Sequence, residues 1–146
     1  MRQSKVADVL SGAKTVFLRC GFEGASVDAI AEEAKVSKAT LYARSPSKNM
    51  LFLRVVQAEC DRLSVEISRP LSRNDSPRAV LEQLSRRMIR LVLDDDYIRL
   101  LRTCTRAVSV LPEAGQIYME AGPRRATRIV GQVLRVLQEA GSVKMQ

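Results

Sequence analysis

Residues 21–52 read GFEGASVDAIAEEAKVSKATLYARSPSKNMLF, and this stretch carries the clearest structural signal in the chain of 146 residues. Ser26 has the residue type of a helix N-cap, and it precedes a short amphipathic segment over residues 27–34. A break of two residues follows, and Ser37 then has the position of a second N-cap. Two short helices joined by a tight turn predict a helix-turn-helix, the motif whose second helix enters the major groove of DNA.

Apolar residues recur with helical spacing on both sides of this motif. The stripe that starts at Val6 indicates an amphipathic helix that ends before Gly21. After the motif, Ser47 is a candidate N-cap for a long helix that runs to about Ser68. We therefore expect a long helix to lead out of the motif into the rest of the chain.

The remaining half of the chain also has helical periodicity. We expect interruptions at Pro112 and at the step from Gly122 to Pro123. No segment alternates with a period of two, so the fold class is all-α, with seven or eight helices in two unequal parts. Apolar residues with helical spacing predict further helices that include residues 81–91, 98–108 and 129–137.

The composition narrows the classes of function. Lys and Arg number 24 against 16 Asp and Glu, and the net charge of +8 favours a polyanionic partner, nucleic acid before an anionic membrane. The chain has no His, and its three scattered cysteines form no CxxC pair. We therefore expect no catalytic residue, no metal site and no cofactor, and we disfavour an enzyme. We expect the cysteines to be buried apolar residues of a cytoplasmic protein without a membrane partner.

The stretch quoted above closely resembles the TetR family of bacterial transcriptional repressors. The resemblance implies a three-helix helix-turn-helix DNA-binding domain over residues 1–48, followed by a larger helical domain over residues 49–146 that binds an effector and dimerises. Its implied partners are double-stranded operator DNA, an unidentified small molecule and a second copy of the chain. The positions that carry the resemblance are Gly21, Phe22, Ser26, Ile30, Ala31, Val36, Ser37, Lys38, Thr40, Leu41, Tyr42, Ser47, Lys48, Leu51 and Phe52.

The resemblance also implies roles for individual residues in DNA binding. Residues 38–40 would face the major groove, while Ser26, Tyr42 and Lys48 would contact phosphates. Arg44 adds another possible phosphate contact. The predicted DNA-binding residues are Ser26, Ser37, Lys38, Ala39, Thr40, Tyr42, Arg44 and Lys48.

Two departures from the family pattern leave an alternative function open. Lys35 stands where the family usually has Gly, which costs about 1 kcal/mol if its φ is positive. Ser45 replaces the usual Phe, and the loss of a buried Phe typically costs about 3–5 kcal/mol. The alternative is a helical ligand-binding or protein-interaction module that has lost operator recognition.

Candidate effector-binding residues in the larger domain are the flexible or amphipathic apolar ones, although such residues more often belong to an ordinary core. The acidic residues 94–96 either pair with arginines or cap the following helix. Family members continue with two long helices after the one that residues 124–143 resemble, so we expect this chain either to be truncated or to dimerise through what remains. The predicted pocket residues are Met88, Tyr97, Leu101, Tyr118 and Met119.

Overall fold

The computed structural model describes residues 2–70 and 76–140, with side chains described from residue 7 onward. These residues form an all-α fold without strands, as the periodicity predicts. The elements are α1 (Arg2–Gly24), α2 (Val27–Glu33), α3 (Lys38–Tyr42), α4 (Lys48–Ser68), α5 (Pro77–Val92), α6 (Asp95–Ala107), α7 (Pro112–Met119), η1 (Glu120–Arg124) and α8 (Arg125–Glu139).

The helix-turn-helix forms as its caps predict. The Ser26 hydroxyl accepts a hydrogen bond from the Ala29 amide at 3.1 Å, and the Ser37 hydroxyl accepts one from the Thr40 amide at the same distance. Between the two helices, Lys35 adopts a φ of 53°, the left-handed conformation that usually requires Gly. Lys35 therefore meets the condition under which a residue other than Gly costs about 1 kcal/mol at this turn.

Three phenyl rings form the centre of the helix-turn-helix part. Gly21, with a φ of 76°, kinks the end of α1 and turns Phe22 back toward the helix. The Phe52 ring lies 5.0 Å from both the Phe17 and the Phe22 ring, centroid to centroid. Aromatic packing between α1 and the start of α4 thus fixes the base of the motif.

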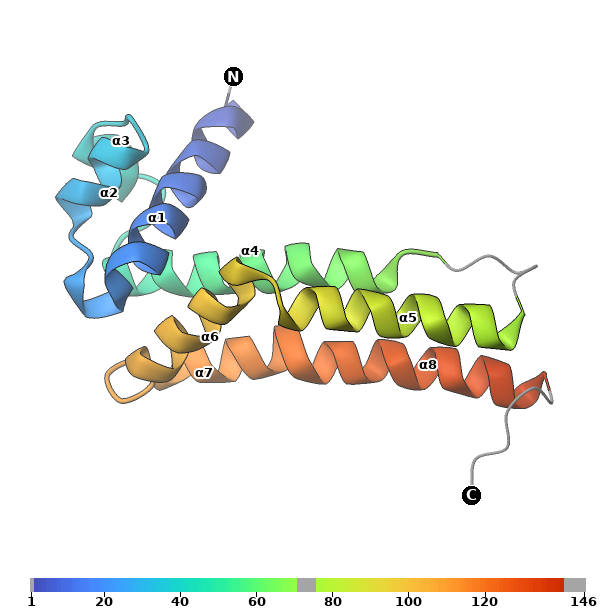
Figure 1. Cartoon of the computed structure of the whole chain (residues 1–146). Coiled ribbons are helices and arrows are strands. Elements are labelled where there is room, and N and C mark those ends of the chain that lie inside the picture. Colours follow the sequence, from blue (N-terminus) through green and yellow to red (C-terminus); the bar gives the residue numbers. More distant parts are fainter. Residues whose placement is uncertain (1, 71–75, 141–146) are drawn as a thin grey trace.

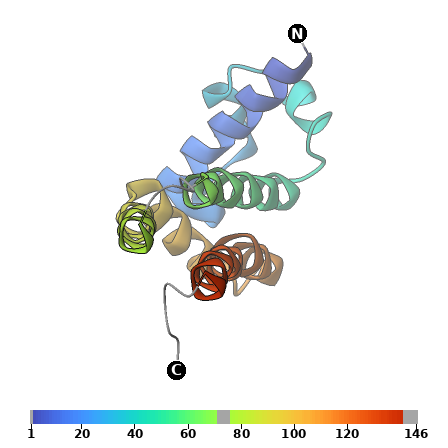
Figure 2. The same ribbon diagram turned by 90° about the vertical axis from the view of Figure 1, so that its right-hand side faces the viewer.

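The long helix α4 joins this part to the larger helical part (Figure 1). Viewed end on, α4, α5 and α8 run side by side (Figure 2). α1 also packs against α6, and one cluster of buried apolar residues continues from Val16 in α1 to Leu100 in α6 and Ala114 in α7. The two parts therefore share a core at their junction.

Two expectations about local structure are wrong. Gly122 and Pro123 do not break the last helix, because a wide π-helical turn, η1, carries the chain continuously from α7 into α8. Such a turn accommodates a Pro, which has no amide hydrogen to donate. Cys60 and Cys104 are buried as expected, but Cys20 is exposed because it lies on the outer side of α1.

None of the helices within residues 2–70 and 76–140 is long and apolar enough to cross a membrane.

Candidate nucleic-acid interface and ligand cavity

The helix α3 presents the predicted base-reading residues on the outside of the molecule. Lys38, Ala39 and Tyr42 are exposed, and Thr40 is half-buried. α3 can take this position because Leu41, on its opposite side, is fully buried in the core. The structure therefore brings these four residues together on one accessible helix surface.

Lys38 is held by an acidic residue of the preceding helix. Its Nζ lies 2.7 Å from Asp28 Oδ1 of α2, although its side chain remains 60% exposed. This hydrogen bond raises the pKa of Lys38, so the ammonium stays charged near neutral pH. An exposed ion pair of this kind is weak enough to exchange for a phosphate or a base edge.

The hydroxyl groups of Ser26, Ser37 and Thr40 form hydrogen bonds within the motif. The Ser37 and Thr40 hydroxyls lie 2.9 Å apart, and each predicted cap serine accepts a backbone hydrogen bond of its own helix. Ser26 and Ser37 therefore set where α2 and α3 begin. The direct structural effect of these serines is to position the helices.

Lys48 is half-buried and contacts the protein backbone. Its Nζ donates to the Ala25 carbonyl at 3.1 Å and to the Glu23 carbonyl at 3.3 Å, and it lies 4.7 Å from the centre of the Phe22 ring. These contacts bind the start of α4 to the connection between α1 and α2. Its role as a phosphate contact stays a prediction.

Arg44 and Ser45, which follow α3, are both shielded from solvent to some extent. Arg44 is half-buried, and its carbonyl accepts a 2.7 Å hydrogen bond from Arg54. Ser45 is only 1% exposed, and its hydroxyl donates to the Ser47 carbonyl at 3.3 Å. The small Ser therefore occupies a closed, hydrogen-bonded position at the end of the motif.

A cavity of about 360 Å³ lies between α4, α5, the start of α6 and the helix from η1 into α8. Ser64 and Thr127 donate their hydroxyl hydrogens to backbone carbonyls, and burial raises the pKa of Cys60 to about 12, so its thiol stays uncharged. None of the described residues that line the cavity has a charged side chain. The lining residues are Cys60, Leu63, Ser64, Ile67, Met88, Leu91, Val92, Tyr97, Gly122, Pro123, Ala126, Thr127 and Val130.

Only part of the predicted pocket lines this cavity. Met88 and Tyr97 do, whereas Tyr118 is buried with its ring centre 6.3 Å from that of Tyr97. Leu101 and Met119 lie outside the cavity, because their helical positions leave them 40% and 44% exposed on the surface. The sequence reasoning also missed the α4 contribution, because the spacing of Cys60, Leu63 and Ile67 is the same for a cavity wall as for a filled core.

The acidic residues at the start of α6 have two different roles. Asp94 caps α6 by accepting a 2.9 Å hydrogen bond from the Tyr97 amide. Asp96 instead pairs with Lys14 of α1, at 2.6 Å between Nζ and Oδ2. No group of three or more possible metal-ligating side chains is found in the described ranges.

Comparison with protein families gives two matches along the chain. Residues 9–55 match the family of bacterial regulatory proteins described as tetR, and this range contains every predicted DNA-binding residue. Residues 79–146 match the C-terminal domain of AefR-like transcriptional repressors. No curated protein sequence matches the chain.

Solved structures of regulators share the fold over nearly the whole chain. The flavonoid-responsive regulator FrrA is 30% identical, with a TM-score of 0.79 over 99% of this chain and 73% of its own. A protein from Mesorhizobium loti MAFF303099 described as a TetR-family transcriptional regulator is 25% identical, with a TM-score of 0.84 over 95% of this chain and 70% of its own. A protein from Pseudomonas aeruginosa PAO1 described as a transcriptional regulator is 20% identical and shares the fold, with a TM-score of 0.76 over 99% and 70% of the two chains.

Proposed function

This chain belongs to the TetR family of bacterial regulatory proteins, and we propose that it is a sequence-specific repressor whose DNA affinity responds to a small, uncharged molecule. The observation that carries the DNA-binding part is the capped, accessible helix α3, held on the core by Leu41. Lys38, Ala39 and Thr40 would face base edges, and Tyr42, Arg44, Ser26 and Lys48 would contact or orient phosphates.

The cavity supports the ligand-responsive part of the proposal. A lining whose described residues carry no charge, and whose Ser64 and Thr127 hydroxyls already donate to backbone carbonyls, suits a neutral, largely apolar molecule, because burying a charge there without a partner is costly. One structural relative is described as flavonoid-responsive, which supports a response to a small molecule here as well. We assign Met88 and Tyr97 to ligand contact.

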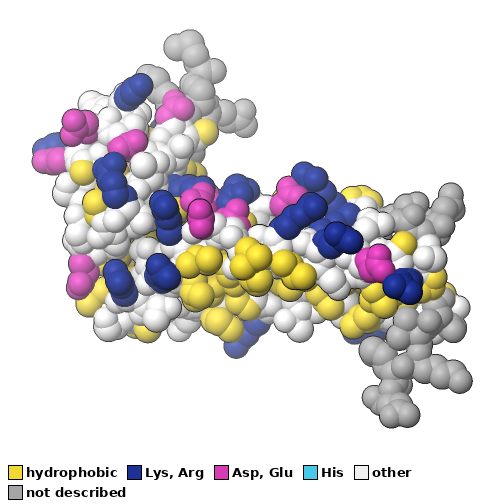
Figure 3. All heavy atoms as spheres, in the orientation of Figure 1, with side chains coloured by type: hydrophobic (Ala, Val, Ile, Leu, Met, Phe, Trp, Pro, Cys, Tyr) yellow, Lys and Arg dark blue, Asp and Glu magenta, His cyan; other side chains and the backbone are white. Residues whose placement is uncertain are grey.

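A homodimer in the cytoplasm, bound to double-stranded operator DNA, is the assembly that fits this function. Two copies would place two α3 helices on half-sites about 34–36 Å apart, one turn of DNA. Figure 3 shows hydrophobic side chains gathered along the middle of the larger part on one face. The exposed apolar residues at the end of α5 include Ile89, Val92 and Leu93, which suits a contact with another protein surface.

Selection of duplexes from a random-sequence library, followed by titration of the enriched duplex, tests the DNA-binding role. We expect the full chain to enrich a palindrome and to lose affinity steeply with salt. Lys38→Gln should weaken binding by roughly 5- to 150-fold, the equivalent of about 1–3 kcal/mol for a base-reading side chain.

Arg78→Gln is the matched control. It also removes one positive charge from an exposed ion pair, but it lies on α5, away from α3. Enrichment of no sequence, or equal losses for Lys38→Gln and Arg78→Gln, would contradict sequence-specific reading by α3. The solution mass with and without the duplex tests the dimer.

A further inference from the structure

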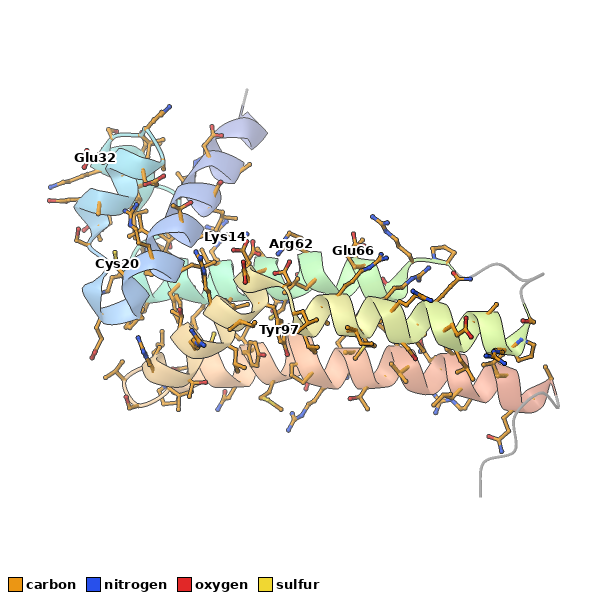
Figure 4. The ribbon with its side chains drawn as sticks, viewed as in Figure 1. Lys14, Cys20, Glu32, Arg62, Glu66 and Tyr97 are labelled. Carbon is orange, nitrogen blue, oxygen red and sulfur yellow. The ribbon has the colours of Figure 1, made fainter. Side chains whose placement is uncertain are left out.

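A group of charged side chains joins α1 to the larger helical part. Lys14 of α1 lies 2.9 Å from Glu59 Oε2 of α4 and 2.6 Å from Asp96 Oδ2 of α6, measured from Nζ. Arg62 of α4 donates to the same Glu59 oxygen at 3.0 Å and lies 3.9 Å from Asp94. Figure 4 shows Lys14 and Arg62 near the place where α1, α4 and the start of α6 come together. We call Lys14, Glu59, Arg62, Asp94 and Asp96 the junction cluster.

Lys14 holds the cluster together because its two partners belong to different helices. Glu59 is only 9% exposed, so its carboxylate needs cationic partners. Burial lowers the pKa of Lys14, but hydrogen bonds to Asp96 and Glu59 outweigh that effect and raise it overall. Lys14 therefore stays charged, and it satisfies both carboxylates while α4 and α6 keep their present separation.

Each carboxylate that binds Lys14 is the sequence neighbour of a residue that lines the cavity. On α4, Glu59 precedes Cys60, and on α6, Asp96 precedes Tyr97. One peptide unit therefore joins each of these two lining residues to a partner of Lys14. On both α4 and α6, a cavity-lining residue directly follows a carboxylate that pairs with Lys14.

On its other side, α1 is tied closely to the helix-turn-helix. Gly12 approaches Ala34 at the end of α2 so closely that an added Cβ would lie 2.7 Å from the Ala34 amide nitrogen. Gly12 and Lys14 are two residues apart on the same helix. This contact ties α1 to α2 close to Lys14, and the turn at Lys35 connects α2 to α3.

We propose that Lys14 is the residue that couples occupancy of the cavity to the position of the DNA-binding helices. A molecule that separates Cys60 from Tyr97 pulls Glu59 and Asp96 apart, and Lys14 then keeps only one of its two ion pairs, which loosens α1. This inference rests on the proposed function for its biological meaning, but the coupling itself can be measured without DNA.

Hydrogen exchange of the α1 amides, residues 9–20, measures the coupling in the chain of 146 residues. N-phenyl-1-naphthylamine, an uncharged apolar fluorophore, serves as the occupant, and its fluorescence rise reports binding. We expect saturating fluorophore to speed exchange in α1 of the unmodified chain by about fivefold or more, the usual lower range of coupling between sites. In Lys14→Gln, exchange should already be faster, and the fluorophore should change it less than about twofold.

Arg19→Gln is the matched control, because it removes a cation of α1 whose partner, Glu33, lies within the helix-turn-helix. It should respond to the fluorophore like the unmodified chain. Asp96→Asn, which removes one ion pair and leaves the other, gives a second variant if Lys14→Gln folds poorly. Val130→Phe places a side chain into the cavity and replaces the fluorophore if the latter does not bind.

The outcomes separate this inference from the proposed function. An occupied cavity with unchanged α1 exchange in the unmodified chain, or an undiminished response in Lys14→Gln, overturns the coupling role of Lys14. Failure to enrich any duplex, together with an intact response of α1, rejects the regulator proposal and leaves the coupling in place.

Discussion

Lys35 ends α2 with a hydrogen-bond pattern that is normally completed by Gly. Its amide donates to the Glu32 carbonyl and the Val36 amide donates to the Ala31 carbonyl, each at 3.0 Å, while Lys35 has the left-handed φ of 53°. The turn of the motif therefore keeps both hydrogen bonds, and the backbone strain of a residue other than Gly is confined to Lys35.

Lys35→Gly should stabilise the chain by about 0.5–1 kcal/mol, because Gly adopts this φ without a steric penalty. Urea unfolding followed by circular dichroism measures the change. Lys35→Ala removes the same charge and keeps the strained backbone, so it should bring no comparable gain. Equal stability of the two variants would show that the backbone conformation is not the cause.

Ser45 departs from the family pattern in a position that the fold has closed. At 1% exposure, a larger side chain must displace its neighbours. We expect Ser45→Phe to destabilise the chain by about 1–3 kcal/mol, the usual cost of overpacking, with Ser45→Ala less harmful. A higher urea midpoint for Ser45→Phe would instead mean that the aromatic ring fits and that Ser45 weakens the motif.

At the scale of whole elements, the contact between α1 and α2 depends on the absence of a side chain. The Cβ of any other residue at position 12 would lie only 2.7 Å from the backbone nitrogen of Ala34. The last helix, by contrast, accommodates a disruptive residue, because the helix continues through Pro123 by widening one turn. Helix packing therefore excludes a side chain at position 12, whereas the last helix accommodates a Pro.

Gly12→Ala should destabilise the chain by about 1–3 kcal/mol, because the new methyl group can be placed only if α1 and α2 separate. Gly131→Ala in α8 is the control, since its added Cβ would meet nothing within 4 Å. That substitution should stabilise by about 0.5–1 kcal/mol through helix propensity. Thermal unfolding of both variants measures the contrast, and a neutral Gly12→Ala would contradict the close packing.

At the scale of the whole molecule, the junction cluster makes the association of the two parts dependent on pH. The hydrogen bond from Lys14 holds the pKa of Asp96 below its usual value. A lowered pKa in the folded chain means that the stabilisation is complete above about pH 4 and is lost as the pH falls through the folded-state pKa.

Asp96→Asn should therefore lower the free energy of unfolding at pH 7 and reduce the loss of stability between pH 4 and the folded-state pKa of Asp96. Urea unfolding at several pH values from 7 to 3 compares the two chains. Glu82→Gln, which removes a carboxylate from an exposed pair on α5, is the control and should leave the pH profile almost unchanged. Parallel curves for Asp96→Asn and the unmodified chain would contradict a contribution from the Lys14 pair.

Much of the fold and part of the candidate site could be predicted from contiguous residues. Serine caps, the apolar side of each helix and the spacing in the motif are local signals, and they located α2, α3 and α4. Met88 and Tyr97 line the cavity, whereas Leu101 and Met119 do not. Residue type does not distinguish the two pairs, because all four are apolar or amphipathic. Which side of a helix meets a cavity depends on how neighbouring helices cross.

The sequence alone therefore determined an all-α chain with a helix-turn-helix of the TetR type, because caps and periodicity act over a few residues. The tertiary structure assigned Lys48 to the backbone of the α1–α2 connection, Cys20 to the surface and Lys14 to a site between Glu59 and Asp96. These assignments join residues that are far apart in the chain. Ion pairing, burial and close approach depend on distances in space, and packing of the helices sets those distances.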